Sequence, residues 1–302
     1  MTEFKGAYTA LVTPMTESGE VDYEGFRNLI QFQLKEGIDG IVPLGTTGET
    51  PTLDESEEDK LLEIAVKEAK GKVPIIAGAG SNDTRHMVKY VQRAKNMGAD
   101  AALVVTPYYN KPNDDGLLRH FEAAANVGIP IIVYNIASRT GKNIPPVLME
   151  KIAQNIGIAG VKESSGDMNQ MGDIINEIAL PRKNNNKKFW VLSGDDSFSL
   201  PLISMGGDGA ISVISNLFPA KVKALVKNAL EGRYEEARVL HYELLPFMKA
   251  AFIETNPVPI KQALSWAGLP AGPARLPLGK LAPSSAAILK KAVAGFGITI
   301  KD

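Results

Sequence analysis

The sequence predicts an α/β protein built as a closed (β/α)8 TIM barrel with a C-terminal helical extension. Short β-rich runs alternate with amphipathic helical segments along most of the chain, a pattern that is typical of a parallel sheet. Eight strand–helix units can be counted over about 230 residues, close to the usual size of such a barrel. This count favours the barrel over an open doubly wound sheet.

The expected strands are short apolar runs that end at polar residues, glycines or prolines. Their length and their content of Val, Ile, Ala and aromatic residues favour strands over buried helices. The runs are 6–11, 40–43, 73–77, 101–106, 131–134, 158–162, 189–193 and 209–213.

Between these runs, apolar residues recur at helical spacing. After Asp22, which can cap a helix, Phe26, Leu29 and Ile30 fall on one face. The basic, Asn-rich run 181–188 is expected to be a solvated loop. The other expected helices are 54–69, one that opens at Asn82 or Asp83, 116–126, one that opens at Pro145, and 169–179.

From residue 234 onward the pattern is helical only. Helices are expected at 234–251, 257–266 and 284–296, with no strand pattern among them. We therefore expect a catalytic barrel at residues 1–232 and a C-terminal helical domain at residues 233–302.

Composition excludes several classes of function. The chain has 302 residues, 44% of them hydrophobic and 22% charged, and its net charge of −1 gives no reason to expect nucleic acid as a partner. There is no cysteine, which excludes disulfides, thiolate metal sites and cysteine nucleophiles. His86, His120 and His241 lie far apart, so we expect no metal site.

Neither a targeting segment nor a nucleotide site is expected. No apolar run has the length of a membrane span, and the start carries no apolar signal segment, so we expect a cytoplasmic protein without a membrane partner. The glycine run 77–82 lacks the third glycine of a dinucleotide fingerprint, and no Walker-type phosphate loop is present. We expect no cofactor.

Lys162 ends the apolar run 158–162, an unusual place for a charge. Burial disfavours the charged form of an amine, and the neutral amine is a nucleophile. The simpler interpretation is a lysine that begins a loop. Tyr134 and Arg139, which end the preceding run, favour the nucleophile because strand ends meet at one face of a barrel.

Other strand ends bring further polar groups to the same face. Thr46 and Thr47 lie in a Gly-Thr-Thr-Gly segment that could be a tight turn bonded to itself or a cradle for a carboxylate. Tyr134 could cap a core instead of meeting a substrate. Arg139 could pair with Glu163.

Six segments in order carry a resemblance to a known family. The sequence resembles the superfamily of dihydrodipicolinate synthase and N-acetylneuraminate lyase, class I pyruvate aldolases on a (β/α)8 barrel, and within it the synthase branch. The segments are 45–49, 105–110, 134–141, 161–163, 193–196 and 256–261.

The resemblance implies roles for individual residues. Lys162 matches the lysine that forms a Schiff base with pyruvate, and Tyr134 matches the tyrosine that shuttles protons. Thr46 and Tyr109 match its partners in a hydroxyl relay, and in the family that second tyrosine reaches across a subunit interface. Tyr109 is therefore expected to complete the site of a neighbouring chain in a homotetramer, a dimer of dimers.

The same resemblance assigns the substrate contacts. Thr47 matches the cradle for the pyruvate carboxylate, while Gly194 and Ile211 belong to the substrate-binding set around the lysine. Arg139 matches an arginine that holds the carboxylate of L-aspartate 4-semialdehyde, because a guanidinium can grip a carboxylate with two hydrogen bonds. The implied reaction is the condensation of pyruvate with L-aspartate 4-semialdehyde on the diaminopimelate route to lysine.

Two departures from the family pattern bear on specificity and control. Ala137 stands where the synthases commonly have proline, which would stiffen the approach to Arg139. At the lysine-feedback site of sensitive members, Asn82 and Tyr108 match, whereas Glu55, Glu58 and His86 differ. We therefore expect weak or absent inhibition by lysine.

Two other functions remain open at this point. One is another class I pyruvate aldolase, such as an N-acetylneuraminate lyase or a 2-keto-3-deoxy-sugar acid aldolase. The other is a barrel that binds pyruvate without catalysis, which the joint presence of Lys162, Tyr134, Tyr109 and Thr46 disfavours.

Overall fold

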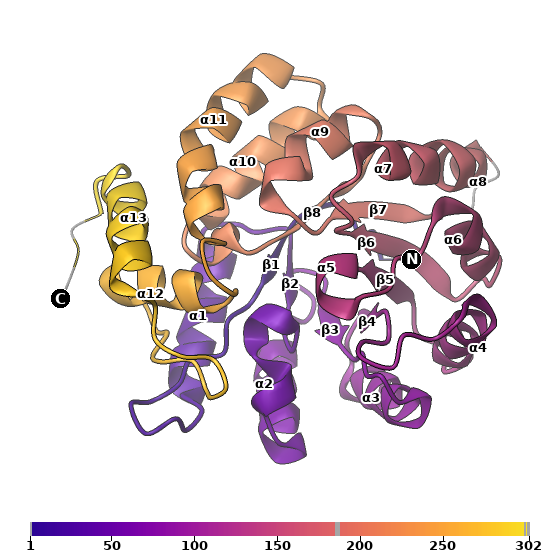
Figure 1. Ribbon diagram of the computed structural model, residues 1–302, viewed down its shortest axis with the longest axis horizontal. Coiled ribbons are helices and arrows are strands. Elements are labelled where there is room, and N and C mark those ends of the chain that lie inside the picture. Colours follow the sequence, from indigo (N-terminus) through magenta and orange to yellow (C-terminus); the bar gives the residue numbers. More distant parts are fainter. Residues whose placement is uncertain (1, 185–187, 299, 301–302) are drawn as a thin grey trace.

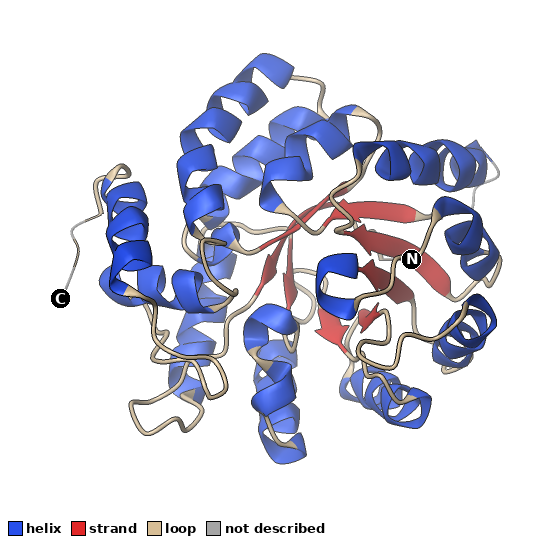
Figure 2. Ribbon diagram, viewed as in Figure 1, coloured by secondary structure: helices blue, strands red, loops and turns tan. Residues whose placement is uncertain are grey.

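The protein is a barrel of eight parallel strands surrounded by helices, seen in a computed structural model that describes residues 2–184, 188–298 and 300. Figure 2 shows the strands at the centre and the helices outside them. The strands are β1 (Gly6–Ala10), β2 (Gly40–Val42), β3 (Ile76–Gly78), β4 (Ala101–Val105), β5 (Ile131–Asn135), β6 (Ile158–Glu163), β7 (Trp190–Ser193) and β8 (Gly209–Ser212).

The helices lie between consecutive strands and after the last one (Figure 1). Two begin at residues expected from the sequence, since Asp22 and Asp83 each accept a backbone N–H of the first turn. They are α1 (Tyr23–Lys35), α2 (Glu55–Ala69), α3 (Thr84–Met97), α4 (Asp114–Ala125), α5 (Ala137–Thr140), α6 (Pro146–Ala153), α7 (Met168–Ile174), α8 (Leu180–Asn184), α9 (Ser199–Ser204), α10 (Pro219–Leu230), α11 (Tyr234–Ala250), α12 (Val258–Trp266) and α13 (Pro283–Ala294).

Pairing of β2 with β3 closes the barrel. Before this closure, neighbouring strands pair in the order β2-β1-β8-β7-β6-β5-β4-β3, and every pair is parallel. Ile41 forms a parallel bridge with Ile75, and Gly78 N–H donates to the carbonyl of Pro43 at 2.9 Å. The predicted (β/α)8 barrel is thereby confirmed.

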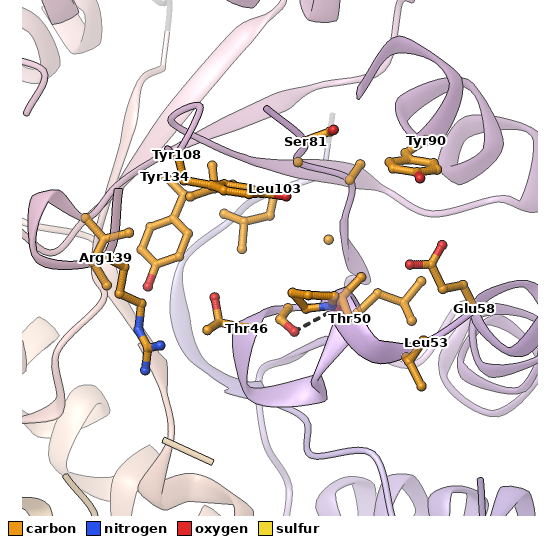
Figure 3. Close-up of a pocket in the computed structure, with 18 of the residues that line it drawn as sticks. Thr46, Thr50, Leu53, Glu58, Ser81, Tyr90, Leu103, Tyr108, Tyr134 and Arg139 are labelled. Carbon is orange, nitrogen blue, oxygen red and sulfur yellow. Dashed lines mark hydrogen bonds between the residues drawn. The ribbon is translucent and has the colours of Figure 1, made fainter. Parts of the chain in front are cut away.

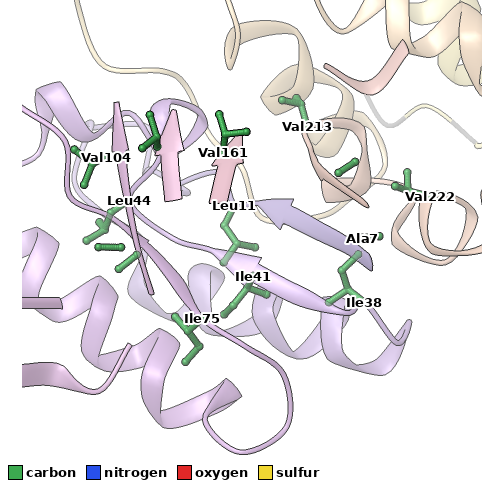
Figure 4. Packing of buried hydrophobic residues seen from close by; sticks show 14 of the residues in the cluster. Ala7, Leu11, Ile38, Ile41, Leu44, Ile75, Val104, Val161, Val213 and Val222 are labelled. Carbon is green, nitrogen blue, oxygen red and sulfur yellow. The ribbon is translucent and has the colours of Figure 1, made fainter. Parts of the chain in front are cut away.

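Alternation along each strand separates two hydrophobic cores. β5 sends Ile132 and Tyr134 into the barrel interior, whereas Ile131 and Val133 face the surrounding helices. Figure 4 shows part of the outer core, where residues such as Val104 and Val161 pack beneath the helices. Successive side chains of a strand therefore point alternately into the barrel and toward the helices.

The C-terminal helices α11 to α13 lie against one side of the barrel (Figure 1). The ring of Phe218, just before α10, packs at 5.1 Å from Phe247 of α11 and at 4.4 Å from Phe296, just after α13. The helical extension is thus confirmed. The division of the chain into domains at residue 232 stays a prediction.

The expected solvated loop at 181–188 is wrong in its first half. After α7 the chain makes a π-helical turn at Ile175–Ala179 and continues as α8 to Asn184. Ile178 is buried in the core, and the helical path is continuous from α7 through Pro181. Residues 185–187 of the expected loop lie outside the described part of the chain.

A buried ion pair joins the β2 loop to the C-terminal region. Lys261 and Glu49 have side chains only 2% and 0% exposed, and Lys261 Nζ lies 2.6 Å from Glu49 Oε1. The ammonium also donates to the carbonyls of Thr13 at 3.0 Å and Pro273 at 2.7 Å, while Arg275 N–H donates to Glu49 Oε2 at 2.8 Å. Burial lowers the pKa of Lys261, and the adjacent Glu49 opposes that shift. The pair thereby ties three distant segments together.

We expect Lys261→Met to lower the free energy of unfolding by about 3–5 kcal/mol, because it leaves the Glu49 carboxylate buried without a cation. Combining it with Glu49→Gln should recover part of the loss, and urea unfolding of the single and double variants measures both effects. Lys60→Met, which removes an exposed pair with Glu63, is the matched control and should change stability by less than about 1 kcal/mol. Additive losses in the double variant would contradict this account.

Candidate active site

Lys162 points into the barrel near the carboxyl end of β6. It pairs in register with Tyr134 of β5 and Leu192 of β7, both interior residues, and is only 6% exposed. Its Nζ lies 4.1 Å from the centre of the Tyr134 ring. The period of two along β6 places Lys162 inside and the next residue, Glu163, outside the barrel.

Glu163 does not pair with Arg139. Its carboxylate accepts hydrogen bonds from Asn135 Nδ2 at 3.0 Å, Ser165 N–H at 2.7 Å and Gln170 Nε2 at 3.3 Å. Burial raises the pKa of Glu163, although these hydrogen bonds oppose the shift. The expected alternative partner of Arg139 is therefore engaged elsewhere.

The two threonines lie on a short 3₁₀ turn, η1 (Thr46–Gly48), which follows β2. The carbonyl of Gly48 accepts the hydroxyl of Thr13 at 2.7 Å, and Glu49, which follows, adopts a left-handed φ of 58° while its carboxylate reaches Lys261. Thr47 Oγ1 accepts a hydrogen bond from Asn256 Nδ2 at 2.9 Å. Contacts from outside the turn thus hold its middle residue and its C-terminal end.

Arg139 lies on α5, the single helical turn after β5. The turn forms without the family's usual proline, since Thr140 N–H donates to the carbonyl of Ile136 and Gly141 N–H to that of Ala137. Arg139 Nη2 donates to the backbone carbonyl of Asn256 at 3.2 Å. Asn256 therefore contacts both the threonine turn and the arginine.

Two cavities meet over the barrel end. One, of about 470 Å³, is lined by Lys162, Thr47 and Gly194 together with the C-terminal segment 252–256. The other, of about 430 Å³, extends toward Glu58 and Tyr90. The residues common to both walls are Thr46, Tyr134, Ile136 and Arg139.

Figure 3 shows this meeting point from the side of the second cavity, with Tyr134, Thr46 and Arg139 at one end and Glu58 and Tyr90 at the other. A lysine amine, a phenol, two threonine hydroxyls and a guanidinium thus converge on one space. A nucleophile, hydroxyls for proton transfer and a binding group for a carboxylate are the parts needed for imine chemistry on a keto acid.

Gly194 and Ile211 occupy different places. A Cβ on Gly194 would lie 1.9 Å from Ser164 Oγ and 2.8 Å from Lys162 Cε, so glycine is required for the lysine to pass. Ile211 is buried in the barrel interior, and among the described cavity-lining residues the end of β8 is represented by Val213. Gly194 is therefore part of the cavity wall, whereas Ile211 belongs to the core near it.

Tyr109 does not join the other predicted residues. Its side chain is 90% exposed, and its backbone has a left-handed φ of 70° that a bulky residue rarely adopts. Tyr108, in contrast, lines the second cavity. The chain by itself therefore presents the Tyr109 phenol to its surroundings.

The predicted lysine-site residues are only partly together. Glu58 and Tyr108 line the second cavity, where Glu58 pairs with Arg93 at 2.5 Å and burial raises the pKa of Glu58. The carbonyl of Asn82 accepts Asn110 Nδ2 at 2.8 Å. His86 is exposed, with its Nδ1 4.0 Å from Asp83.

Asp196 holds the end of β8 from beneath the cavity. Its Oδ2 accepts the backbone N–H groups of Val213 at 3.0 Å and Ile214 at 3.1 Å. Burial raises the pKa of Asp196 to about 6. The position of Val213 in the cavity wall therefore depends on a titratable group.

Sequence reasoning assigned no role to Asn256 or Lys261 and did not predict the buried ion pair that Glu49 forms. Asn256 and Lys261 lie in the segment 256–261, and Glu49 ends the segment 45–49. Both segments carry the family resemblance, but a sequence motif does not show which residues its members contact. Within the described residues, no group of three or more His, Asp or Glu side chains is arranged to hold a metal ion. No described helix is long and apolar enough to cross a membrane.

Comparison with known proteins gives consistent matches over nearly the whole chain. Residues 3–295 match the Dihydrodipicolinate synthetase family. A curated protein of Protochlamydia amoebophila named 4-hydroxy-tetrahydrodipicolinate synthase is 52% identical over 275 residues, 91% of this chain and 90% of that protein.

Solved structures agree in fold. The dihydrodipicolinate synthase of Aquifex aeolicus matches with a TM-score of 0.94 and 43% identity, covering 99% of this chain and 100% of that one. A pyruvate complex of the synthase from Acinetobacter baumannii matches with a TM-score of 0.93 and 35% identity, covering 98% and 100%. The fold and sequence matches therefore point to the same proteins.

We expect Asp196→Asn to change how stability depends on pH. Because the folded-state pKa of Asp196 is raised to about 6 from its usual 3.8, its contribution to stability is present below about pH 4 and is lost as pH rises through 6. Asparagine keeps an acceptor for Val213 and Ile214 without this titration. Between pH 4 and 7 the free energy of unfolding of the variant should therefore rise relative to that of the wild type, by about 3 kcal/mol at most.

Urea unfolding at a series of pH values and one protein concentration measures this difference. A stability difference that stays constant between pH 4 and 7 would contradict the assigned role of Asp196.

Proposed function

The chain belongs to the dihydrodipicolinate synthetase family, and on that premise we propose that it is a 4-hydroxy-tetrahydrodipicolinate synthase. It is a class I lyase that joins pyruvate to L-aspartate 4-semialdehyde through a Schiff base, as a step of lysine and diaminopimelate synthesis. The single observation that supports the site best is the buried Lys162 amine, 4.1 Å from the Tyr134 ring in a cavity shared with Thr46, Thr47 and Arg139.

In the proposed mechanism Lys162 Nζ attacks the keto carbon of pyruvate. The carbinolamine loses water to form an imine, and the protonated imine accepts the electron pair left when a methyl proton departs. The resulting enamine carbon forms a bond to the aldehyde carbon of the second substrate, whose oxygen takes up a proton. The amino group of that substrate then attacks the imine carbon, which closes the ring and releases the Lys162 amine. The imine nitrogen supplies the electron sink, so no external cofactor is required.

Tyr134 and Thr46 are proposed to move the protons of these steps. Both line the space next to the amine, and hydroxyl groups within reach of a reacting nitrogen can act as general acid and base. Thr47, held by Asn256, would receive the pyruvate carboxylate beside Gly194. Arg139 would hold the carboxylate of L-aspartate 4-semialdehyde, and holding both reactants contributes to the rate through positioning.

Tyr109 is proposed to complete the site of a neighbouring copy within a homotetramer, a dimer of dimers. Its exposed phenol, away from the cavity of its own chain, supports this role. A monomer as active as the assembled protein in sedimentation and activity measurements would contradict it. A cytoplasmic location, without membrane or nucleic-acid partners, is part of the same proposal.

We expect Lys162→Ala to abolish both condensation and the covalent mass that borohydride adds in the presence of pyruvate, because the described residues that line the cavity include no other lysine. Arg139→Lys should keep the trapped mass but lower kcat/KM for aspartate semialdehyde by about 10- to 100-fold, since lysine lacks the two-pronged grip. Mass spectrometry and a condensation assay on the same samples measure both.

Lys227→Ala, a change at an exposed lysine, is the control and should behave as the wild type. Trapping at a lysine other than Lys162 would contradict the proposed mechanism. Cleavage of a keto-sugar acid in place of condensation would identify another pyruvate aldolase, and trapping without any turnover would identify a binding protein.

We expect weak or absent inhibition by lysine. Glu58 is already paired with Arg93, and His86 places no carboxylate where a lysine ammonium would need one. Condensation rates measured against increasing lysine at saturating pyruvate test this. Activity that falls close to zero in sub-millimolar lysine would contradict it.

A further inference from the structure

Asn256 carries an acceptor without a partner at the wall of the active-site cavity. The residue is 5% exposed and lines the 470 Å³ cavity with Lys162 and Arg139. Its Nδ2 donates to Thr47 and its backbone carbonyl accepts from Arg139, but its Oδ1 is buried and has no hydrogen-bond partner. A buried polar atom without a partner is costly, so such an atom at a cavity indicates a missing ligand group.

The ligand group that fits Oδ1 is a hydrogen-bond donor next to a carboxylate. Because Arg139 Nη2 lies 3.2 Å from the carbonyl of Asn256, a carboxylate held by the guanidinium would lie beside this residue. An α-amino acid carries its amine one carbon from its carboxylate. The amine of a substrate anchored at Arg139 therefore comes close to the Asn256 side chain.

Charge in the same part of the cavity also favours an amine. Asp195 and Glu254 line the same cavity as Asn256. Asp195 Oδ1 accepts Ser197 N–H at 2.8 Å, and Glu254 Oε1 accepts Ala282 N–H at 3.1 Å, so both carboxylates are held in place. The cavity thus contains both the cationic Arg139 and fixed anionic groups. This arrangement is complementary to a zwitterionic α-amino acid.

We propose that Asn256 is the residue that recognises the α-amino group of the second substrate, with Oδ1 accepting a hydrogen bond from that amine while Arg139 holds the adjacent carboxylate. This inference rests on the proposed function and deepens it. It makes Asn256 a substrate-binding residue that determines specificity for an α-amino semialdehyde. Its Nδ2 keeps Thr47 in place for pyruvate at the same time.

Paired substrates test the proposal. L-aspartate 4-semialdehyde and succinate semialdehyde share the carboxylate and the aldehyde, but only the first has the amine. The wild type should have the higher kcat/KM for L-aspartate 4-semialdehyde. In Asn256→Ala the ratio of the two kcat/KM values should fall by about 10- to 100-fold. Where turnover of succinate semialdehyde is too slow to follow, its inhibition constant against aspartate semialdehyde replaces kcat/KM.

Two further variants separate amine recognition from support of the threonine turn. Thr47→Val removes the hydrogen bond to Asn256 Nδ2 but leaves Oδ1 in place, so it should lower activity on both substrates while keeping the preference. Asn256→Asp retains an acceptor at this place and should keep or increase the preference.

The outcomes are distinct. The proposal would be overturned if Asn256→Ala lowered kcat/KM equally for the two substrates. It would also be overturned if Thr47→Val narrowed the preference for aspartate semialdehyde as much as Asn256→Ala does. A wild type that neither condenses aspartate semialdehyde nor traps pyruvate would instead overturn the proposed function. Retained trapping of pyruvate in Asn256→Ala with a narrowed preference supports the assignment.

Discussion

The buried pair of Glu49 and Lys261 is the interaction on which the geometry of the cavity depends. Glu49 ends the turn that carries the two threonines, and Lys261 belongs to the helix that follows Asn256. Two charges taken out of water keep their place only when each is paired and its remaining donors and acceptors are satisfied. Here the carbonyls of Thr13 and Pro273 accept hydrogen bonds from the Lys261 ammonium, so its remaining donors are satisfied. The ion pair and these hydrogen bonds connect the barrel to its C-terminal extension.

The barrel contributes rigidity and direction. Parallel strands in register bring Lys162 beside Tyr134, and alternation along the strand directs the amine inward while Glu163 joins a separate polar network outside. The interior positions of the neighbouring strands are filled by apolar side chains, and the polar groups near the amine lie in the cavity above them. A loop built without this register would not hold the amine at a fixed distance from the phenol.

The loops and the C-terminal segment contribute selectivity. Asn256 connects Thr47, where a keto acid would be held, to Arg139, where a second carboxylate would be held. A single residue therefore links the threonine turn to the arginine. Since the segment 252–256 forms one side of the cavity, the helical extension takes part in the site and is more than a cover for the barrel.

The sequence by itself determined the strand–helix rhythm, the barrel and the family, because periodicity and short motifs are local properties of the chain. It also predicted that Lys162, Tyr134 and the threonine pair lie together, since each lies near or just after the carboxyl end of a strand. It did not determine the helix at 181–184 or the partners of Glu163, which depend on packing between segments. Only the tertiary structure decided that Asn256 and Lys261, more than 200 residues along the chain from the threonine turn, complete that turn, because a hydrogen bond between distant residues leaves no pattern in the sequence around either one.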